Sequence, residues 1–403
     1  DKNGVPTLPM SADLSADGGV GYPLLVKAAA GGGGKGMRVV ESASQLKTSI
    51  AAAQREAKAG FGDDRVFLER FVARARHIEI QLLGDGVGNL VHLGERECSI
   101  QRRHQKVVEE SPSPRVDAQL RKAMGEAALQ LGRALSYRSA GTVEFLVDDE
   151  TGEFWFLEVN TRLQVEHPVT EMVTGIDLVR EQLRIARGEE LGFTQADIRF
   201  EGAAVEVRLY AEDPANGFLP VTGTLAALDT RDAPPVRWDS GVEAGSVVGA
   251  DFDPMLAKVI ASGPTRAEAA GRLALSLERT HLGGMRTNRD FLVAVLRSPE
   301  FLAGDTTTDF IERVNPAREL APTDAERELT IRLAALFVQG ENRAAAPVLA
   351  DFPSGWQNGR MPAQHVAFSL RKERCDVHYR SMRDGSFCFD DGTVARMHAW
   401  SPE

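Results

Sequence analysis

Residues 157–167 hold more groups capable of chemistry than any other stretch of the chain, reading Leu-Glu-Val-Asn-Thr-Arg-Leu-Gln-Val-Glu-His. Every second position carries a large polar side chain, at Glu158, Asn160, Arg162, Gln164 and Glu166. In an extended chain this spacing places all five on one face, while the apolar alternate positions anchor the other. A solvated strand would also alternate, but the hydrophobic run 154–157 leads into this one. We therefore predict that the polar face lines a cleft, where ionisable groups mark functional sites.

Another carboxylate, Glu144, lies in the otherwise apolar segment 141–147. A buried lone carboxylate is costly unless it is paired or bound to a cation. Glu158 and Asn160 lie two residues apart on one strand face, so two adjacent strands could supply three oxygen ligands. That donor set suits Mg²⁺ bound together with substrate phosphates. The alternative for Glu144 is an ion pair with a nearby Arg or Lys.

Glu166 cannot reach the same ion if the strand stays straight, because eight residues would separate it from Glu158 by roughly 26 Å. Either two subsites are involved, or the chain bends after Asn160. A bend would bring Arg162, Gln164 and Glu166 around one pocket beside the metal. Arg162 could then clamp a small oxyanion and Glu166 could act as a general base. This combination indicates a small acid that is activated by ATP.

A glycine cluster at 31–36 lies between two predicted strands, 22–27 and 37–41. It formally contains G-x-G-x-x-G, but a dinucleotide site needs a helix to follow, and the Walker A pattern also fails at Gly36. We interpret it as a flexible hairpin whose backbone N–H groups could fold over a triphosphate. Lys27 would add a point charge. The alternative is a merely mobile turn.

A third polar segment, 95–106, is dense in Glu, Arg, Gln and His and contains neither Gly nor Pro. Its composition predicts an ordered loop between strands. The alternative is a solvated, charge-rich loop.

Composition sets wider limits on the chain. Its 403 residues allow two or three domains, and 43% hydrophobic content is ordinary for a globular protein. A formal net charge of −11 argues against non-specific nucleic-acid binding. The three cysteines have no metal-ligand spacing and indicate a reducing compartment. We expect no membrane span and no signal peptide, since neither pattern is visible.

Hydrophobic periodicity predicts alternating short strands and helices. Expected strands cover 22–27, 37–41, 66–72, 77–83, 142–148, 154–160 and 203–210. Expected helices cover 42–60, 117–135, 265–282 and 323–340. Ser42 and Gln45 form a possible capping box, and Gly60 is the expected stop. A linker is expected at 316–322, and short strands with Asp-Gly turns at 364–398.

At these residues the chain resembles biotin carboxylase, a member of the ATP-grasp superfamily. The resemblance covers residues from about 3 to 315 and rests on an ordered series of segments: Gly31–Met37, Arg76–Gln81, Glu95–Glu110, Gly141–Phe145, Glu158–Thr170, Val205–Pro214, Gly217–Gly223 and Phe252–Lys258. It implies an α+β protein with an ATP-grasp domain at 3–200, whose glycine-rich lid covers about 22–83. A biotin carboxylase C-terminal domain at 201–316 would follow.

The resemblance also implies an activity, the ATP-dependent carboxylation of biotin by bicarbonate. The residues it assigns to ATP are Lys27, Gly32, Gly33, Gly34, Met37, Glu69, Val72, His77, Gln101, His104 and Leu146. It assigns Mg²⁺ or Mn²⁺ to Glu144 and Glu158, with Asn160 close by. The residues it assigns to bicarbonate are Arg162, Gln164, Val165 and Lys106.

Two implied catalytic roles remain. Glu166 would deprotonate bicarbonate, and Arg208 would stabilise the biotin enolate. Taken alone, Arg208 would instead be read as a strand-edge salt bridge with Glu206 or Glu212, and His77 as a satisfied core histidine.

Residues 323–403 resemble the start of the middle domain of acyl-CoA carboxylase α subunits, a partial helix-plus-β-barrel domain that contacts the carboxyltransferase β subunit. No Glu-Ala-Met-Lys-Met-type motif occurs, so biotin is expected on a separate carrier domain. The family's Rossmann-like N-terminal domain is also not in this sequence. The resemblance implies a multi-subunit complex in the cytoplasm, or in the mitochondrial matrix of a eukaryote. The alternatives are another ATP-grasp ligase with an amine acceptor, and a non-catalytic scaffold subunit.

Overall fold

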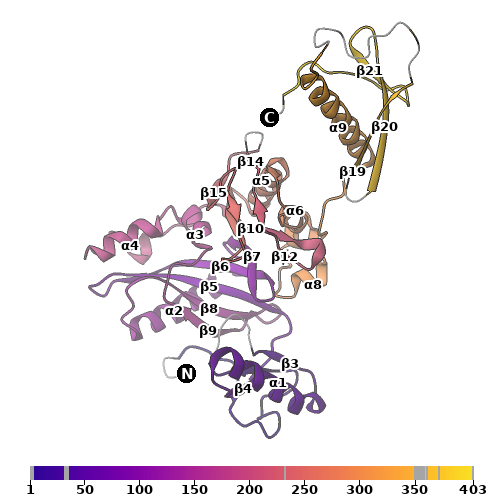
Figure 1. Ribbon diagram of the computed structural model, residues 1–403. Coiled ribbons are helices and arrows are strands. Elements are labelled where there is room, and N and C mark those ends of the chain that lie inside the picture. Colours follow the sequence, from indigo (N-terminus) through magenta and orange to yellow (C-terminus); the bar gives the residue numbers. More distant parts are fainter. Residues whose placement is uncertain are drawn as a thin grey trace. The chain divides into compact units, whose positions relative to one another are not determined.

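The computed structural model describes residues 4–30, 36–230, 233–348, 359, 362–370 and 373–401. The predicted phosphate-binding glycines, Gly32, Gly33 and Gly34, lie outside the described residues. The chain divides into two compact units, Asp1–Leu320 and Ala321–Glu403. The elements of each unit are labelled in Figure 1.

A small antiparallel sheet carries the N-terminal part of the first unit. Its strand order is β1-β4-β2-β3, with β1 at Met10–Ser11, β2 at Leu24–Ala28, β3 at Arg38–Val40 and β4 at Val66–Arg70. Helix α1 (Ala43–Phe61) packs Leu46 and Ala53 against Leu24, Val26 and Leu68 of this sheet.

The ends of α1 differ from the prediction. Ser42 is the N-cap residue, but its side chain makes no capping bond, and Gln45 instead accepts from the backbone N–H of Glu41. The helix continues past Gly60 and ends at Gly62, whose φ of 75° is the left-handed conformation that glycine adopts freely. The predicted capping box and stop residue were therefore wrong.

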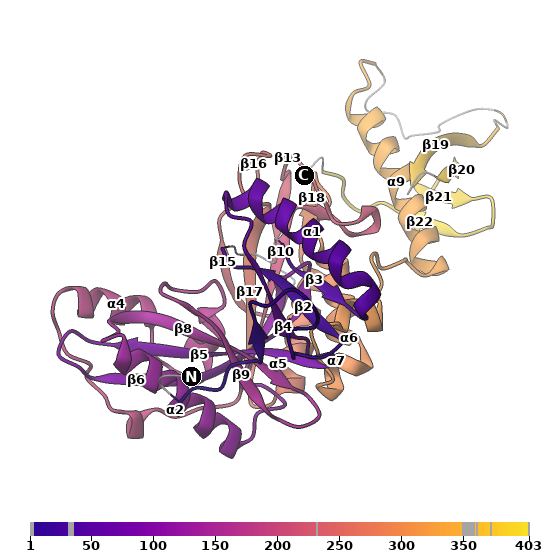
Figure 2. The same cartoon turned by 90° about the horizontal axis from the view of Figure 1, so that it is seen from below.

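An eight-stranded antiparallel sheet forms the centre of the unit (Figures 1 and 2). Its order is β15 (Arg237–Ser240), β17 (Met255–Gly263), β10 (Ala203–Tyr210), β7 (Gln105–Ser111), β6 (Leu90–Arg102), β5 (Ala75–Gly84), β8 (Ser139–Asp148) and β9 (Phe154–Asn160). Within the segment 22–83, expected as the lid, β2, β3 and β4 join the small sheet and β5 joins the large one. Local strand signals do not show which sheet a strand joins.

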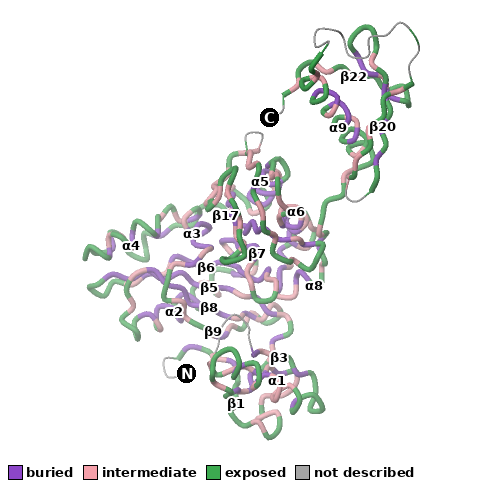
Figure 3. The backbone as a smooth tube through the Cα atoms, viewed as in Figure 1, coloured by how far each residue is buried: buried purple, intermediate pink, exposed green. Residues whose placement is uncertain are grey.

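The two faces of the large sheet have different chemistry because side chains alternate along each strand. Ile78, Ile80 and Leu82 of β5 pack with Met124 of α2 (Ala118–Ala134). The alternate residues point to the opposite face, which α3 (His167–Thr174) and α4 (Leu178–Ala186) cover. Buried residues follow β5 and β6 along most of their length (Figure 3).

The segment 95–106 is a β-hairpin and not the predicted loop. Strands β6 and β7 meet at Arg103 and His104, which have φ of 49° and 67°. The strand was missed because its polar side chains are buried in ion pairs: Glu95 with Arg121, Arg96 with Glu79, and Glu97 with Arg76. This pairing removes the usual alternation of apolar and polar positions.

The rest of the first unit packs helices on β10 and β17. These are α5 (Arg266–Arg279), α6 (Arg289–Arg297), α7 (Pro299–Ala303) and α8 (Phe310–Val314). Val205 and Val207 of β10 join Leu273 and Phe291 in that core. Short strand pairs also occur, namely β11 (Glu212–Asp213) with β12 (Leu219–Pro220), β13 (Gly223–Thr224) with β16 (Val247–Val248), and β14 (Ala227–Asp229) with β18 (His281–Gly283).

The second unit combines α9 (Asp324–Ala344) with an antiparallel meander. Its strands are β19 (Gln364–Leu370), β20 (Glu373–Ser381), β21 (Ser386–Phe389) and β22 (Val394–Arg396). Thr323 and Glu326 form a capping box that begins α9. Gly385 and Gly392 have positive φ after β20 and β21, where Asp-Gly turns were predicted. Within the described residues, no helix is long and apolar enough to cross a membrane.

We predict that Gly202→Ala destabilises the first unit by about 1–3 kcal/mol. Gly202 precedes β10 with φ of 68°, and an added Cβ would lie 2.3 Å from the carbonyl oxygen of Gly263. Urea unfolding measures the effect. Gly271→Ala in α5 is the matched control, because its Cβ meets no atom within 4 Å, and it should stabilise by about 0.5–1 kcal/mol. Equal effects of the two changes would contradict the prediction.

Candidate functional site

A buried ammonium group joins three carboxylates at the centre of the large sheet. Lys106 Nζ lies 2.7 Å from Glu79, 3.0 Å from Glu144 and 2.6 Å from Glu166. Lys106 comes from β7, Glu79 from β5 and Glu144 from β8, while Glu166 directly precedes α3. Four elements that are separate in sequence therefore meet at one cation.

Electrostatics favour the charged forms of Lys106 and Glu79. Burial opposes the charge of Lys106, but Glu79, Glu166 and Glu144 outweigh it and raise the lysine pKa well above its usual value. Burial likewise opposes ionisation of Glu79, yet Arg96 and Lys106 hold its pKa below the ordinary range. Arg96 supplies a second cation, with Nε 2.5 Å from Glu79.

Arg208 of β10 closes the cluster on the other side of Glu166. Its Nε donates to Glu109 at 2.6 Å and its Nη2 to Glu166 at 3.1 Å. Burial opposes this charge too, but Glu109 and Glu166 raise the guanidinium pKa. The alternative, a strand-edge salt bridge with Glu206 or Glu212, was wrong. Glu206 has no hydrogen-bond partner among the described residues, and Glu212 pairs with Arg102 at 2.8 Å.

The chain bends after Asn160, which is one of the two alternatives that the distance argument left open. Strand β9 ends at Asn160, residues 161–166 are irregular, and α3 begins at His167. The bend returns Gln164 to Glu144, with Nε2 to Oε1 at 3.4 Å. Arg162 Nη1 donates to Gln164 at 3.3 Å. The straight-strand alternative was wrong, and the predicted oxyanion residues do lie beside the predicted metal ligand Glu144.

Lys258 of β17 holds the same bend through a hydrogen bond to its backbone. Its Nζ donates to the carbonyl of Val165 at 2.9 Å and pairs with Asp239 at 3.1 Å. Sequence reasoning gave no role to Lys258 or Glu79, although both lie in segments that resemble the family. A lysine and a glutamate among apolar strand neighbours were the available signals.

The predicted nucleotide residues fall into two groups. On the large sheet, His77 bonds Gln101 at 2.7 Å, lies opposite Leu146 on β8, and has Nε2 3.0 Å from Glu144. Leu146 packs against the cluster that holds Val72.

On the small sheet, Lys27 pairs with Glu69 at 2.9 Å. Met37 lies just before β3, and His104 is exposed in the β6–β7 turn. The described residues therefore bring most of this predicted set to three neighbouring strands of the large sheet, β6, β5 and β8, and to the small sheet.

The carboxylates fit a divalent cation. Glu144 lies opposite Glu158 across β8 and β9, and Asn160 Nδ2 lies 3.4 Å from Glu158. Burial raises the pKa of Glu144, but His77 and Lys106 outweigh it and lower that pKa to about 2. An ionised carboxylate beside other oxygen ligands is what Mg²⁺ requires.

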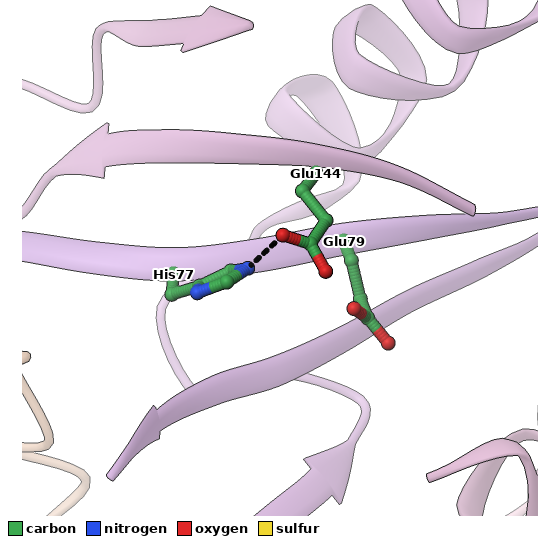
Figure 4. A group of neighbouring side chains, drawn as sticks. All are labelled: His77, Glu79 and Glu144. Atoms are coloured by element: carbon green, nitrogen blue, oxygen red, sulfur yellow. Dashed lines mark ion pairs between the residues drawn. The ribbon is translucent and has the colours of Figure 1, made fainter. Parts of the chain in front are cut away.

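A further group of candidate ligands lies on β5 and β8. Ligand atoms of His77, Glu79 and Glu144 lie within 4.8 Å of one another (Figure 4). In Figure 4 the Glu144 carboxylate points between the other two side chains. The ion pair offered as an alternative for Glu144 is also present, since Lys106 contacts it.

Comparison with known proteins identifies the family. The chain matches "Carbamoyl-phosphate synthase L chain, ATP binding domain" over residues 5–194 and "Biotin carboxylase C-terminal domain" over residues 206–313. It is 45% identical to a biotin carboxylase of a Nostoc species over 324 residues, covering 78% of this chain and 72% of that protein. The chain belongs to the biotin carboxylase family. Its fold is the ATP-grasp biotin carboxylase fold with a C-terminal domain, as the resemblance implied.

Solved structures agree with this family. The biotin carboxylase domain of the 2-oxoglutarate carboxylase of Hydrogenobacter thermophilus, with MgADP, ADP and bicarbonate, has a TM-score of 0.76 and 39% identity. It covers 80% of this chain and 72% of that one. A biotin carboxylase complex from Campylobacter jejuni has a TM-score of 0.73 and 38% identity, covering 77% and 71%.

Longer relatives extend the similarity. The propionyl-CoA carboxylase alpha chain of Ruegeria pomeroyi is 43% identical over 413 residues, covering 95% of this chain. The mitochondrial methylcrotonoyl-CoA carboxylase subunit alpha of Rattus norvegicus is 47% identical over 309 residues, covering 76% of this chain. This chain spans 59% of the length of the propionyl-CoA carboxylase alpha chain and 42% of the length of the methylcrotonoyl-CoA carboxylase subunit.

We predict that Lys106→Met destabilises the first unit by about 3–5 kcal/mol, because removing one member of a buried ion cluster leaves uncompensated charge. Glu79, Glu144 and Glu166 would lose their shared donor. Lys122→Met, at an exposed position in α2, is the control and should change stability by less than about 0.5 kcal/mol. Urea unfolding at neutral pH compares the two. A Lys106→Met protein as stable as the control would rule out a central role for this cation.

Proposed function

We propose that this chain catalyses the ATP-dependent carboxylation of biotin by bicarbonate, as the biotin carboxylase component of an acyl-CoA carboxylase. The single observation that carries the proposal is the setting of Glu166. This carboxylate is fully buried, and its two oxygens face two different cations, Lys106 and Arg208. A base thus lies between a candidate oxyanion site and a candidate enolate-stabilising group.

The first half-reaction activates bicarbonate. Arg162, Gln164, the backbone at Val165 and Lys106 are the proposed contacts to the anion, and the bend after Asn160 gathers them. Glu166 takes the proton of bicarbonate, and the resulting oxygen attacks the γ-phosphorus of ATP. The bond from that phosphorus to the β-γ bridging oxygen breaks, so ADP leaves and carboxyphosphate forms.

The second half-reaction transfers carbon. Carboxyphosphate breaks into CO₂ and phosphate, and the phosphate takes the N1′ proton of biotin. The nitrogen then attacks CO₂, which gives carboxybiotin. Arg208 holds the enolate oxygen while negative charge develops there, and a cation placed where charge develops is a major source of rate. The position of Arg208 beside Glu166 supports use of both groups in one site.

The nucleotide site uses the predicted set. Lys27 and the glycines at 32–34 would contact phosphates, and Glu69, Val72, His77, Gln101, His104, Leu146 and Met37 would shape the pocket. Glu144 and Glu158, with Asn160 beside them, would hold Mg²⁺ or Mn²⁺. When bound, that ion would neutralise phosphate charge. The carboxylate pairing across β8 and β9 supports this ligand set.

The wider assembly is part of the proposal. We assign an ATP-grasp domain to 3–200, a C-terminal domain to 201–316 and a partial middle domain to 323–403. Support for an acyl-CoA carboxylase comes from similarity to the propionyl-CoA carboxylase alpha chain over 95% of this chain. The proposed partners are a carboxyltransferase β subunit and a biotin carrier domain, in the cytoplasm or mitochondrial matrix.

The activity test is bicarbonate- and biotin-dependent ADP formation by the purified chain. We expect Glu166→Gln to lower kcat by about 100-fold or more, because it removes the general base. Glu150→Gln, in an exposed turn, is the matched control and should leave the rate unchanged. Formation of ADP that depends on an amine acceptor, or a holoenzyme unaffected by Glu166→Gln, would contradict the proposal. The first result favours another ATP-grasp ligase, and the second a scaffold subunit.

A further inference from the structure

Two buried carboxyl groups close to Arg208 lie opposite each other and have too few hydrogen-bond partners. Glu109 of β7 lies directly opposite Glu206 of β10, and both side chains are fully buried. Residues directly opposite on one sheet face have Cβ atoms only about 4.5–5.5 Å apart. Glu206 and Arg208 lie on the face that α3 covers, because Ala204 packs with Val169 and Val173 of α3. The alternate residues of β10 face α5.

The hydrogen bonds of the pair are incomplete. Glu109 Oε1 accepts from Arg208, but Glu109 Oε2 has no partner among the described residues. Neither oxygen of Glu206 has one there. A buried carboxylate without partners is costly. Two ionised carboxylates side by side also repel each other, and a shared proton removes both penalties at once.

The neighbouring charges decide which residue keeps the proton. Several titratable groups interact electrostatically with Glu109 or Glu206. They are Cys98 of β6, Lys106 of β7, Glu166 at the start of α3, Arg208 and Tyr210 of β10, and Lys258 of β17. Because the Arg208 guanidinium contacts Glu109, it favours the ionised form of the Glu109 side chain. Lys258 is occupied by Asp239 and the Val165 carbonyl, so it supplies no hydrogen bond to Glu206.

We propose that Glu109 and Glu206 are a proton-sharing carboxyl pair that positions Arg208. Glu206 keeps the proton and donates it to Glu109 Oε2, so Glu109 stays a carboxylate whose other oxygen aims the guanidinium. Both are positioning residues, since neither contacts the reacting groups in the proposed mechanism. The catalytic consequence rests on the proposed function, but the proton itself does not.

The pKa shifts of Glu206 and Glu109 agree with this geometry. Burial raises the pKa of Glu206, and the neighbouring Glu109 raises it further, to well above its usual value. Burial raises the pKa of Glu109 to about 7, although Arg208 lowers it. Glu109 is therefore ionised above about pH 7 and protonated below it. As the pH falls through this range, Arg208 loses one of its two carboxylate contacts.

Two substitutions of Glu206 separate hydrogen bonding from packing. In Glu206→Gln a neutral amide still donates to Glu109, so we expect kcat within about threefold of wild type and an unchanged acid limb of the pH profile. In Glu206→Met the donor is lost. We expect kcat to fall about tenfold. The acid limb of the pH profile should move about one pH unit higher, since loss of the donor raises the pKa of Glu109. KM for ATP should stay the same. Glu201→Gln, exposed just before β10, is the control.

Two kinetic outcomes would overturn the proposal. If Gln and Met substitutions move the acid limb equally, Glu206 is ionised in the native protein and shares no proton. If both only lower the unfolding midpoint and leave the pH profile unchanged, the pair has a structural role alone.

An infrared measurement tests the proton without using activity. The difference spectrum of wild type minus Glu206→Gln at neutral pH should contain the carbonyl stretch of a protonated carboxyl group. Its absence would refute the pair even in an active enzyme. Its presence in a wild-type chain without biotin-dependent ADP formation would refute the proposed function and leave the pair standing.

Discussion

The contact between Lys106 and three buried carboxylates is the constraint on which the rest of the first unit depends. Ion pairs of this kind are costly to desolvate and are stable only when their geometry and remaining hydrogen bonds are complete. Here the remaining oxygens of Glu79, Glu166 and Glu144 face Arg96, Arg208 and His77, respectively. Strands β5, β7 and β8 and the start of α3 must therefore keep their register, since a one-residue slip would move each charge to the apolar face.

The large sheet makes this possible by separating its two faces. Isoleucine and leucine side chains meet α2 on one face, while the alternate positions carry charge toward α3. The bend after Asn160 then adds a second layer, because it returns Gln164 to Glu144 and anchors Val165 through Lys258. Glu166 reaches the cluster only because α3 begins there. The proposed base, the proposed oxyanion contacts and the proposed metal ligand Glu144 thus lie close together.

Sequence reasoning succeeded where side-chain alternation is local. It placed β9 and β10 at their observed limits, and the distance between Glu158 and Glu166 made a bend one of its two alternatives. It failed for the β6–β7 hairpin, because buried ion pairs such as Arg96 with Glu79 look like a solvated loop in sequence. It also did not show which sheet each strand joins, since strand pairing between distant segments leaves no local signal.

The sequence by itself determined the kinds of groups present, their order along strands and, through resemblance, the family. Only the tertiary structure decided which charged side chains form ion pairs with one another. Lys106 finds carboxylates 27, 38 and 60 residues away, and Arg208 pairs with Glu109 and Glu166 rather than with its neighbours in sequence. The physical reason is that a buried charge is stabilised by whatever the fold places within a few ångströms of it. That distance depends on sheet order and register, which one-dimensional spacing does not contain.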